Sequence, residues 1–176
     1  MPDDPVPRLR ILIAEDETII RLDLRQLLEE HGFEVVGEAR DGLEAVELAR
    51  ETQPDVALFD IRMPELDGVE AARRIYAERP LPIVMLTAYA DPELVTRAIG
   101  AGVFGYLTKP FEARDVVPAI HAAVARHEEL LAARRHIGNG RQSVELDVRS
   151  SSGQVWPLRL SRRADGSLDV TLYNLK

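Results

Sequence analysis

The chain of 176 residues is 45% apolar and 30% charged, which fits one globular domain with a small addition and leaves little room for two full-sized domains. It contains no cysteine, so disulfides, thiolate catalysis and thiolate metal sites are excluded, and its four histidines show no metal-ligand spacing. No apolar run approaches the roughly 20 residues that span a bilayer, and the first ten residues lack the regions of a signal peptide. We therefore expect a cytoplasmic protein without membrane contact.

The net charge of −8 is unevenly distributed along the chain. Through Arg135 there are 26 acidic and 16 basic residues, whereas the remaining 41 residues hold 4 acidic and 6 basic residues. The first part should repel nucleic acid, and the second is too weakly basic for its charge to predict nucleic-acid binding. Only two of the 22 basic residues are lysines, Lys109 and Lys176, so the internal Lys109 stands out.

Short apolar runs alternate with segments of helical period from residue 9 to residue 134. The apolar runs predict strands over Leu9 to Ala14, Phe33 to Gly37, Val56 to Asp60, Pro82 to Leu86 and Val103 to Leu107. The predicted helices are Thr18 to His31, Gly42 to Glu51, a third that follows the Met63-Pro64 break and runs to about Glu78, Asp91 to Gly100, and about Glu112 to Arg134. Pro118 either kinks the last helix or marks a later start.

Five strand-helix units of about 25 residues each predict a parallel sheet with helices on both faces, because right-handed crossovers place them there. The fold class is therefore α/β, doubly wound and flavodoxin-like. Asp41, Asp67 and Asp91 are expected to be helix N-caps or turn residues, and Glu17 a first-turn acid. The four histidines, His31, His121, His127 and His136, are expected at the surface or near helix ends.

The last forty residues show a different pattern. Three alternating runs at 143–149, 154–160 and 167–175 are separated by turns, the second of which contains Asp165-Gly166, a hairpin signal. We predict a small antiparallel β-meander, which buries too little surface to be stable alone and should pack against the large domain, a second copy or a target protein. The predicted organisation is a disordered 1–8, an α/β domain at 9–135 with an extended last helix, a linker at 136–142 and the meander at 143–176.

Polar residues stand where the predicted parallel strands end. Glu15 and Asp16 follow the first strand, Asp60 ends the third, Thr87 follows the fourth and Lys109 comes just after the fifth. Three carboxylates at one edge repel one another unless a cation compensates them, and Mg²⁺ prefers this oxygen-rich setting. A hydroxyl and an ammonium opposite them suit a phosphoryl group, so the pattern predicts phosphoryl transfer to a carboxylate.

At these positions the sequence resembles the receiver domains of two-component response regulators. The resemblance lies in four segments in the family's order: ILIAEDE at 11–17, DVALFDIRMP with LDG beyond it at 55–68, MLTA at 85–88 and GYLTKPF at 105–111. It covers about residues 9 to 125 and implies the CheY-like form of the doubly wound fold.

The resemblance implies that Asp60 is the phospho-acceptor, which attacks the phosphorus of a phosphohistidine on a sensor histidine kinase. Glu15, Asp16 and Asp60 would hold Mg²⁺ together with the backbone carbonyl of Arg62, and Lys109 would pair with the phosphoryl group. Family members mostly carry two aspartates where this chain has Glu15 and Asp16. The longer Glu15 is expected either to shift the metal or to contact it through water.

The resemblance further implies a switch. Thr87 would move toward the phosphate, Tyr106 would turn inward, and the peptide bond before Pro110 would be cis. Ala88 would leave the aspartate accessible. Tyr106 has a simpler alternative as a half-buried strand aromatic. The surface near the fourth helix, fifth strand and fifth helix would then change its partner, either a downstream protein or a second copy of the chain.

Three alternatives to a simple phospho-receiver remain. The domain is most similar to receivers joined to a three-helix, RNA-binding antiterminator module, but the last forty residues show no such helices, so a transcriptional or RNA-binding output through this tail is an alternative. An interaction module without phosphorylation would show no Mg²⁺ effect. A phosphatase with an aspartyl nucleophile would need a second acid two residues after Asp60, where this chain has Arg62, so we do not expect an enzyme with sustained turnover.

Overall fold

The computed structural model describes residues 8–88, 101–138, 143–149, 155–163 and 168–172. The strands of its larger sheet are β1 (Arg10–Ala14), β2 (Glu34–Ala39), β3 (Val56–Asp60), β4 (Ile83–Thr87) and β5 (Val103–Thr108). The helices are α1 (Thr18–Glu30), α2 (Gly42–Thr52), α3 (Gly68–Glu78) and α5 (Ala113–Gly138). The helix predicted over Asp91 to Gly100 and the first seven residues lie outside the described residues.

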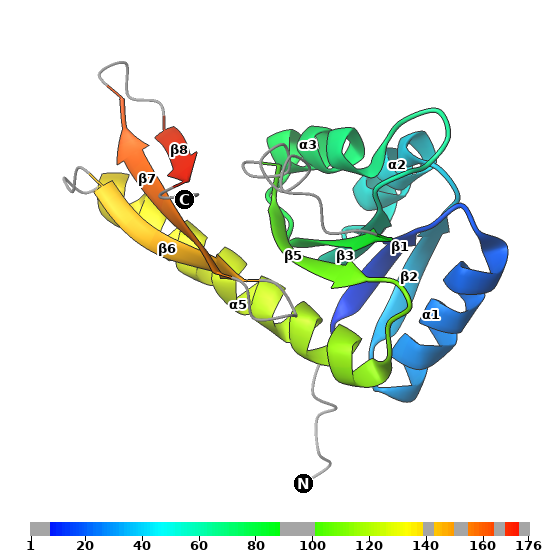
Figure 1. Ribbon diagram of the computed structural model, residues 1–176. Coiled ribbons are helices and arrows are strands. Elements are labelled where there is room, and N and C mark those ends of the chain that lie inside the picture. Colours follow the sequence, from blue (N-terminus) through cyan, green and yellow to red (C-terminus); the bar gives the residue numbers. More distant parts are fainter. Residues whose placement is uncertain (1–7, 89–100, 139–142, 150–154, 164–167, 173–176) are drawn as a thin grey trace, which may run out of the picture.

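The five strands are parallel and lie in the order β2-β1-β3-β4-β5. Helices α1 and α5 cover one face of the sheet, and α2 and α3 cover the other (Figure 1). The predicted doubly wound α/β fold is therefore confirmed. In this topology the order of the strands reverses beside β1 and β3, and the crevice beyond the carboxyl ends of the strands lies at that reversal.

The core lies between the sheet and its two helical layers. Because helices cover both faces, all five residues of β3 and of β4 are buried, and these strands are apolar up to their last residues, Asp60 and Thr87. The largest fully buried side chains include Phe59, Ile11, Ile13, Leu24 and Leu86. Burying one such side chain contributes about 1.5–3 kcal/mol, so this core holds the strand ends in fixed positions.

Two of the predicted helix caps are confirmed. The carboxylate of Asp41 accepts a 2.8 Å hydrogen bond from the backbone N–H of Glu44, and that of Asp67 accepts one of the same length from Glu70. These bonds satisfy backbone donors that the first turns of α2 and α3 leave free. Glu17 occupies the N-cap of α1 without a side-chain cap, and Asp91 lies outside the described residues.

The last helix is longer than the sequence predicted. Helix α5 continues to Gly138, so residues 136–138 are helical where a linker was expected. Pro118 lies inside the helix, which begins at Ala113 and continues past it. The predicted start at about Glu112 is therefore confirmed and the alternative of a start at Pro118 is wrong, because the packing of α5 against the sheet outweighs one missing hydrogen bond.

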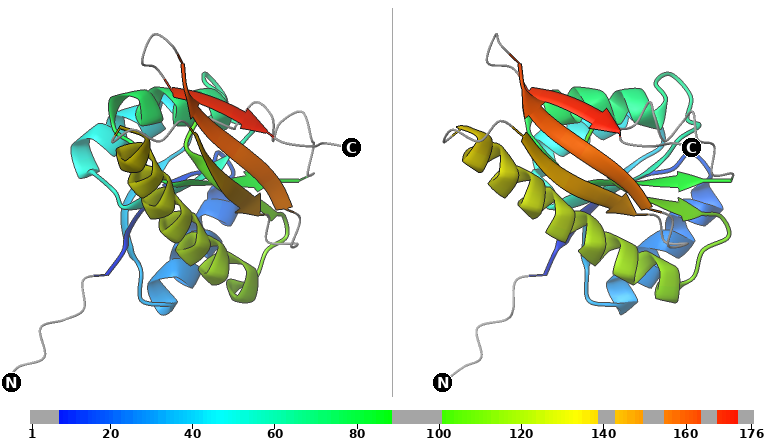
Figure 2. Two further views of the ribbon diagram at one scale, coloured as in Figure 1. Left: turned by 90° about the vertical axis from the view of Figure 1, so that its left-hand side faces the viewer. Right: turned by 60° about the vertical axis from the view of Figure 1, so that its left-hand side comes forward.

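The residues after α5 form a second, three-stranded sheet. Its strands are β6 (Ser143–Arg149), β7 (Val155–Arg162) and β8 (Leu168–Leu172), antiparallel in the order β6-β7-β8. Strands β6 and β7 pack beside α5, and β6 also lies near β5 (Figures 1 and 2). Among the described helices, none is both long enough and apolar enough to cross a bilayer.

Candidate functional site

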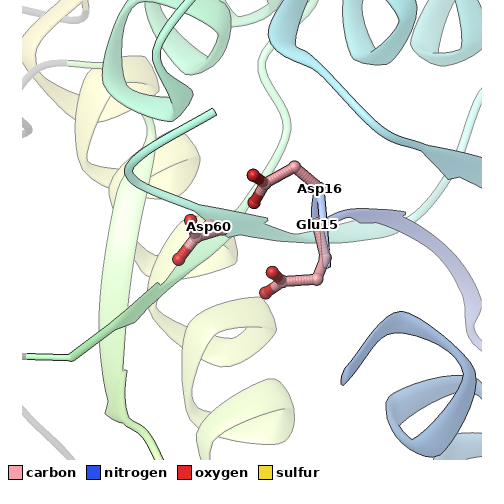
Figure 3. Close-up of side chains that lie close together, drawn as sticks. All are labelled: Glu15, Asp16 and Asp60. Carbon is pink, nitrogen blue, oxygen red and sulfur yellow. The ribbon is translucent and has the colours of Figure 1, made fainter. Parts of the chain in front are cut away.

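Polar residues gather where four parallel strands of the main sheet end. Glu15 and Asp16 follow β1, Asp60 and Thr87 end β3 and β4, and Lys109 follows β5. Figure 3 shows that the side chains of Glu15, Asp16 and Asp60 lie close together, with the carboxyls of Glu15 and Asp16 extending toward the side of Asp60. One carboxylate oxygen from each of these three residues lies within 4.8 Å of the others. The strand ends therefore assemble the acidic cluster that the sequence predicted.

The ammonium group of Lys109 bridges two of the three acids. Its Nζ lies 2.7 Å from Oε2 of Glu15 and 3.1 Å from Oδ1 of Asp60. The second Asp60 oxygen, Oδ2, accepts a 3.1 Å hydrogen bond from the backbone N–H of Arg62. Lys109 is held in place from the backbone as well, because its N–H donates to the carbonyl of Thr87 over 2.8 Å. The one internal lysine thus lies at the centre of the cluster.

Burial governs the charge balance of the cluster. Glu15 is fully buried and Asp60 nearly so, and this burial raises the pKa of both carboxyls, although Lys109 works in the opposite direction. Burial alone would lower the pKa of Lys109, but its hydrogen bonds and ion pairs with Glu15 and Asp60 raise the pKa above its ordinary value. The cluster therefore contains three acids and one ammonium group, so acidic groups are in excess.

The side chains of the cluster fit a hard divalent cation. All three offer carboxylate oxygens, which Mg²⁺ prefers over nitrogen or sulfur ligands. Asp16 is exposed, while Glu15 and Asp60 are buried, so the cluster has both a protein side and a side open to solvent. A cation that keeps part of its water shell suits this arrangement, because Mg²⁺ gives up its waters reluctantly.

The loop after Asp60 packs against the backbone of the acid itself. A Cβ atom on Gly68 would lie 2.0 Å from the carbonyl oxygen of Asp60, and the N–H of Gly68 donates to the carbonyl of Ile61 over 2.9 Å. Glu65 adopts a left-handed backbone conformation with φ of 62°, and the N–H of Leu66 reaches the carbonyl of Pro64 over 2.6 Å. The start of α3 thus packs against the end of β3 at a point where only glycine fits.

The residues predicted to form the switch lie on neighbouring strands. Thr87 ends β4, and Tyr106 pairs with Met85 in the register of β4 and β5. Both Thr87 and Tyr106 are buried, and burial raises the pKa of the Tyr106 hydroxyl. The peptide bond between Lys109 and Pro110 is cis. Ala88 and Arg62 are exposed beside the cluster.

Two features of the structure were not predicted from the sequence. The prediction of surface positions for the histidines is wrong for His127, which is 8% exposed between the rings of Tyr76 and Phe104. The contact of Arg21 with the acidic loop was not predicted either: its guanidinium donates to the backbone carbonyls of Glu15 and Asp16. A signal existed for Arg21, because side chains in the first turns of a helix point back toward its N-terminus.

Comparisons with known proteins agree with this geometry. The model of the response regulator receiver domain matches residues 11–121. The chain is 48% identical over 168 residues to the transcriptional regulatory protein PdtaR of Mycobacterium tuberculosis, covering 96% of this chain and 76% of the relative. It is also 40% identical over 113 residues to the chemotaxis protein CheY of Bacillus subtilis, covering 64% of this chain and 94% of that protein.

Solved structures give the same result. The signal receiver domain of a modulated diguanylate cyclase from Desulfovibrio desulfuricans G20 matches with a TM-score of 0.65 and 38% identity, covering 70% of this chain and 99% of that one. A CheY-like receiver domain protein from Methanospirillum hungatei JF-1 matches with a TM-score of 0.64 and 30% identity, with the same coverage. The family match, the relatives and the acidic cluster at the strand ends agree, and the chain belongs to the response regulator receiver domain family.

Proposed function

We propose that this protein is a phosphorylation switch in which Asp60 accepts a phosphoryl group from the phosphohistidine of a sensor histidine kinase. The observation that carries the proposal is the position of the Lys109 ammonium between Glu15 and Asp60, two members of the acidic cluster that Asp16 completes. An amine and three acids at one strand edge can hold a cation and a transferred phosphate together. As part of this proposal the protein acts in the cytoplasm, where its kinase partner presents the phosphohistidine.

In the proposed reaction, one carboxylate oxygen of Asp60 attacks the phosphorus atom. A phosphorus–oxygen bond to Asp60 forms, and the phosphorus–nitrogen bond to the histidine of the kinase breaks. Glu15, Asp16 and Asp60, with the backbone carbonyl of Arg62, would hold Mg²⁺, which when bound supplies positive charge for the phosphoryl oxygens.

The chain's own side chains complete the site. The Lys109 ammonium exchanges its contact with Asp60 for one with the phosphoryl group, and the Thr87 hydroxyl donates to a phosphoryl oxygen. The chain thus acts as a phospho-acceptor that promotes its own phosphorylation and dephosphorylation.

Phosphorylation would act through charge. It adds about two negative charges at Asp60, which draws Thr87 and Lys109 toward the phosphoryl group and changes how Tyr106 packs in β5. The affected surface consists of β5, α5 and the predicted helix at 91–100, and β6 lies beside this surface. A downstream protein or a second copy of the chain is the proposed partner of that surface.

The experiment that tests the acceptor is a labelling assay with radioactive acetyl phosphate. The wild type should incorporate label in the presence of Mg²⁺ and lose that ability when EDTA removes the metal. Asp60→Asn should incorporate none, because it lacks the nucleophilic oxygen.

Asp55→Asn is the matched control for this assay. Asp55 is an exposed acid just before β3, at the end of that strand opposite to Asp60. Among the described contacts, its carboxylate accepts a hydrogen bond only from the backbone N–H of Arg10. Asp55→Asn should therefore incorporate label like the wild type. Equal labelling of Asp60→Asn and wild type would refute the assigned acceptor.

A transcriptional output is the second candidate. It is favoured by the likeness to a relative named as a transcriptional regulatory protein, which extends over 96% of this chain. It ranks second because the residues after α5 form β6, β7 and β8 and carry only a weak positive charge, which gives little attraction for nucleic acid.

A further inference from the structure

The guanidinium of Arg21 lies against the loop that carries two of the three clustered acids. Its Nη1 donates to the backbone carbonyl of Glu15 over 2.5 Å and to that of Asp16 over 3.5 Å. Its Nη2 reaches the hydroxyl of Thr18 over 3.4 Å, within the same loop and helix start. Only 16% of the Arg21 side chain is exposed, so it lies between the helix and the loop and is not a free surface cation.

Two hydrogen bonds hold the backbone at Glu15, and Arg21 donates one of them. On one side the N–H of Glu15 donates to the carbonyl of Ala39 in β2 over 3.0 Å. On the other side the carbonyl of Glu15 accepts from Arg21. The Glu15 carbonyl belongs to the peptide group that joins Glu15 to Asp16, so removing the Arg21 bond frees that group, on either side of which the side chains of Glu15 and Asp16 project.

The ion pair of Arg21 with Glu38 is longer than its contacts with the loop. Its Nε lies 3.9 Å from a carboxylate oxygen of Glu38, whereas Nη1 of Arg25, one turn further along α1, lies 2.6 Å from the same carboxylate group. Arg25 therefore satisfies Glu38 without help from Arg21. The partners that depend on Arg21 are the carbonyls of the acidic loop.

We propose that Arg21 is a positioning residue for the cation site and fixes the loop so that Asp16 stays within reach of Glu15 and Asp60. This inference rests on the proposed function, since it requires that the cluster binds Mg²⁺. Groups that orient the ligands of a metal set its affinity although they do not touch it. Asp16 has the greatest need of such support, because it is the exposed member of the cluster.

The direction in which Mg²⁺ affinity changes when Arg21 is removed distinguishes a positioning role from a purely electrostatic one. A nearby guanidinium repels Mg²⁺, so removing its charge should strengthen binding if Arg21 acted only through its field. If Arg21 acts by holding the loop, removing it should weaken binding.

We would titrate the full chain with MgCl₂ by isothermal titration calorimetry and compare Arg21→Gln with wild type. We expect a loss of roughly tenfold in Mg²⁺ affinity, the lower end of the range for groups that orient metal ligands. Arg21→Lys should recover part of the affinity, because an ammonium can still donate to the Glu15 carbonyl. Thermal unfolding of both variants without Mg²⁺ shows whether the fold survives.

Arg25→Gln is the matched control, since it removes an arginine from the same helix and from the same partner, Glu38, without touching the loop. It should bind Mg²⁺ like the wild type. If Arg21→Gln binds as tightly as Arg25→Gln, or more tightly, the inference is wrong. Asp16→Asn distinguishes this failure from that of the proposed function: if it binds like the wild type, or if the wild type binds no Mg²⁺, the cluster itself is not the cation site.

Discussion

His127 shows how burial sets the chemistry of one residue far from the acidic cluster. Its ring centroid lies 5.5 Å from that of Phe104 and 6.3 Å from that of Tyr76, and both contacts are edge-on. Within the described part of the chain its Nε2 is buried without a hydrogen-bond partner. Burial lowers the pKa of His127, and the nearby charges of Arg134 and Arg79 lower it further. His127 is therefore neutral in the folded protein near pH 7.

This lowered pKa predicts a loss of stability in mild acid. The unfolded chain takes up a proton on His127 near pH 6.5, whereas the folded chain resists it, so the free energy of unfolding should fall as the pH drops from about 6.5 to the folded pKa. His127→Leu should show a smaller loss between about pH 7.5 and about pH 5.5, because the titrating group is gone. Urea unfolding at the two pH values measures this.

The exposed His121 on the same helix provides the control for that measurement. His121→Leu removes an exposed imidazole from the same helix, so comparing it with His127→Leu isolates the contribution of the buried ring. The same pH dependence for wild type and His127→Leu would show that His127 does not couple folding to pH.

At the scale of one element, α5 is helical although a proline in its sequence opposes the helical conformation. Pro118 has no N–H to donate to the carbonyl of Arg114, four residues earlier, and such a residue inside a helix is costly. The helix forms because its inner face, including Val116, Ile120 and Ala123, is fully buried. Tertiary packing thus decides the conformation where local propensity opposes it.

Replacing this proline should stabilise the protein. Pro118 is exposed, so Pro118→Ala removes little packing and restores one backbone hydrogen bond; we expect a gain of about 1–2 kcal/mol in the free energy of unfolding. Chemical unfolding with urea measures the gain. Pro80→Ala, in the exposed turn before β4, should instead lose about 0.4–1 kcal/mol, because there the proline only restricts the unfolded chain. A loss in both variants would contradict this account of α5.

At the scale of the whole molecule, the two sheets meet around α5. Strands β6 and β7 pack beside that helix, and β6 lies near β5, which carries Tyr106 and leads to Lys109 (Figure 2). The small sheet therefore lies next to the strand whose packing the proposed phosphorylation would change. The division of the chain into a receiver and a separate β element stays a prediction, as does the formation of a homodimer.

This arrangement predicts a fluorescence change on activation. Trp156 is the single tryptophan and belongs to β7. Adding beryllofluoride and Mg²⁺, which mimic the phosphorylated aspartate, should change the intensity or wavelength of its emission, because the surface next to the small sheet is rearranged. Asp60→Asn treated in the same way should show no change. If the emission of the wild type stays constant although the protein incorporates phosphate, the predicted coupling between phosphorylation and the small sheet is wrong, and the proposed phosphorylation itself still holds.

The local features of this protein follow from its sequence. Buried parallel strands are continuously apolar and helices repeat every three to four residues, so the order of elements, the caps Asp41 and Asp67, and the acids at the strand ends could all be predicted. A doubly wound topology then brings the strand ends to one edge without further information.

Only the tertiary structure decided which distant residues touch. The burial of His127 against Phe104 and the contacts of β6 with α5 and β5 join parts of the chain whose contact no local period predicts. Periodicity reports which face of an element is buried, but the partner on that face depends on the global arrangement.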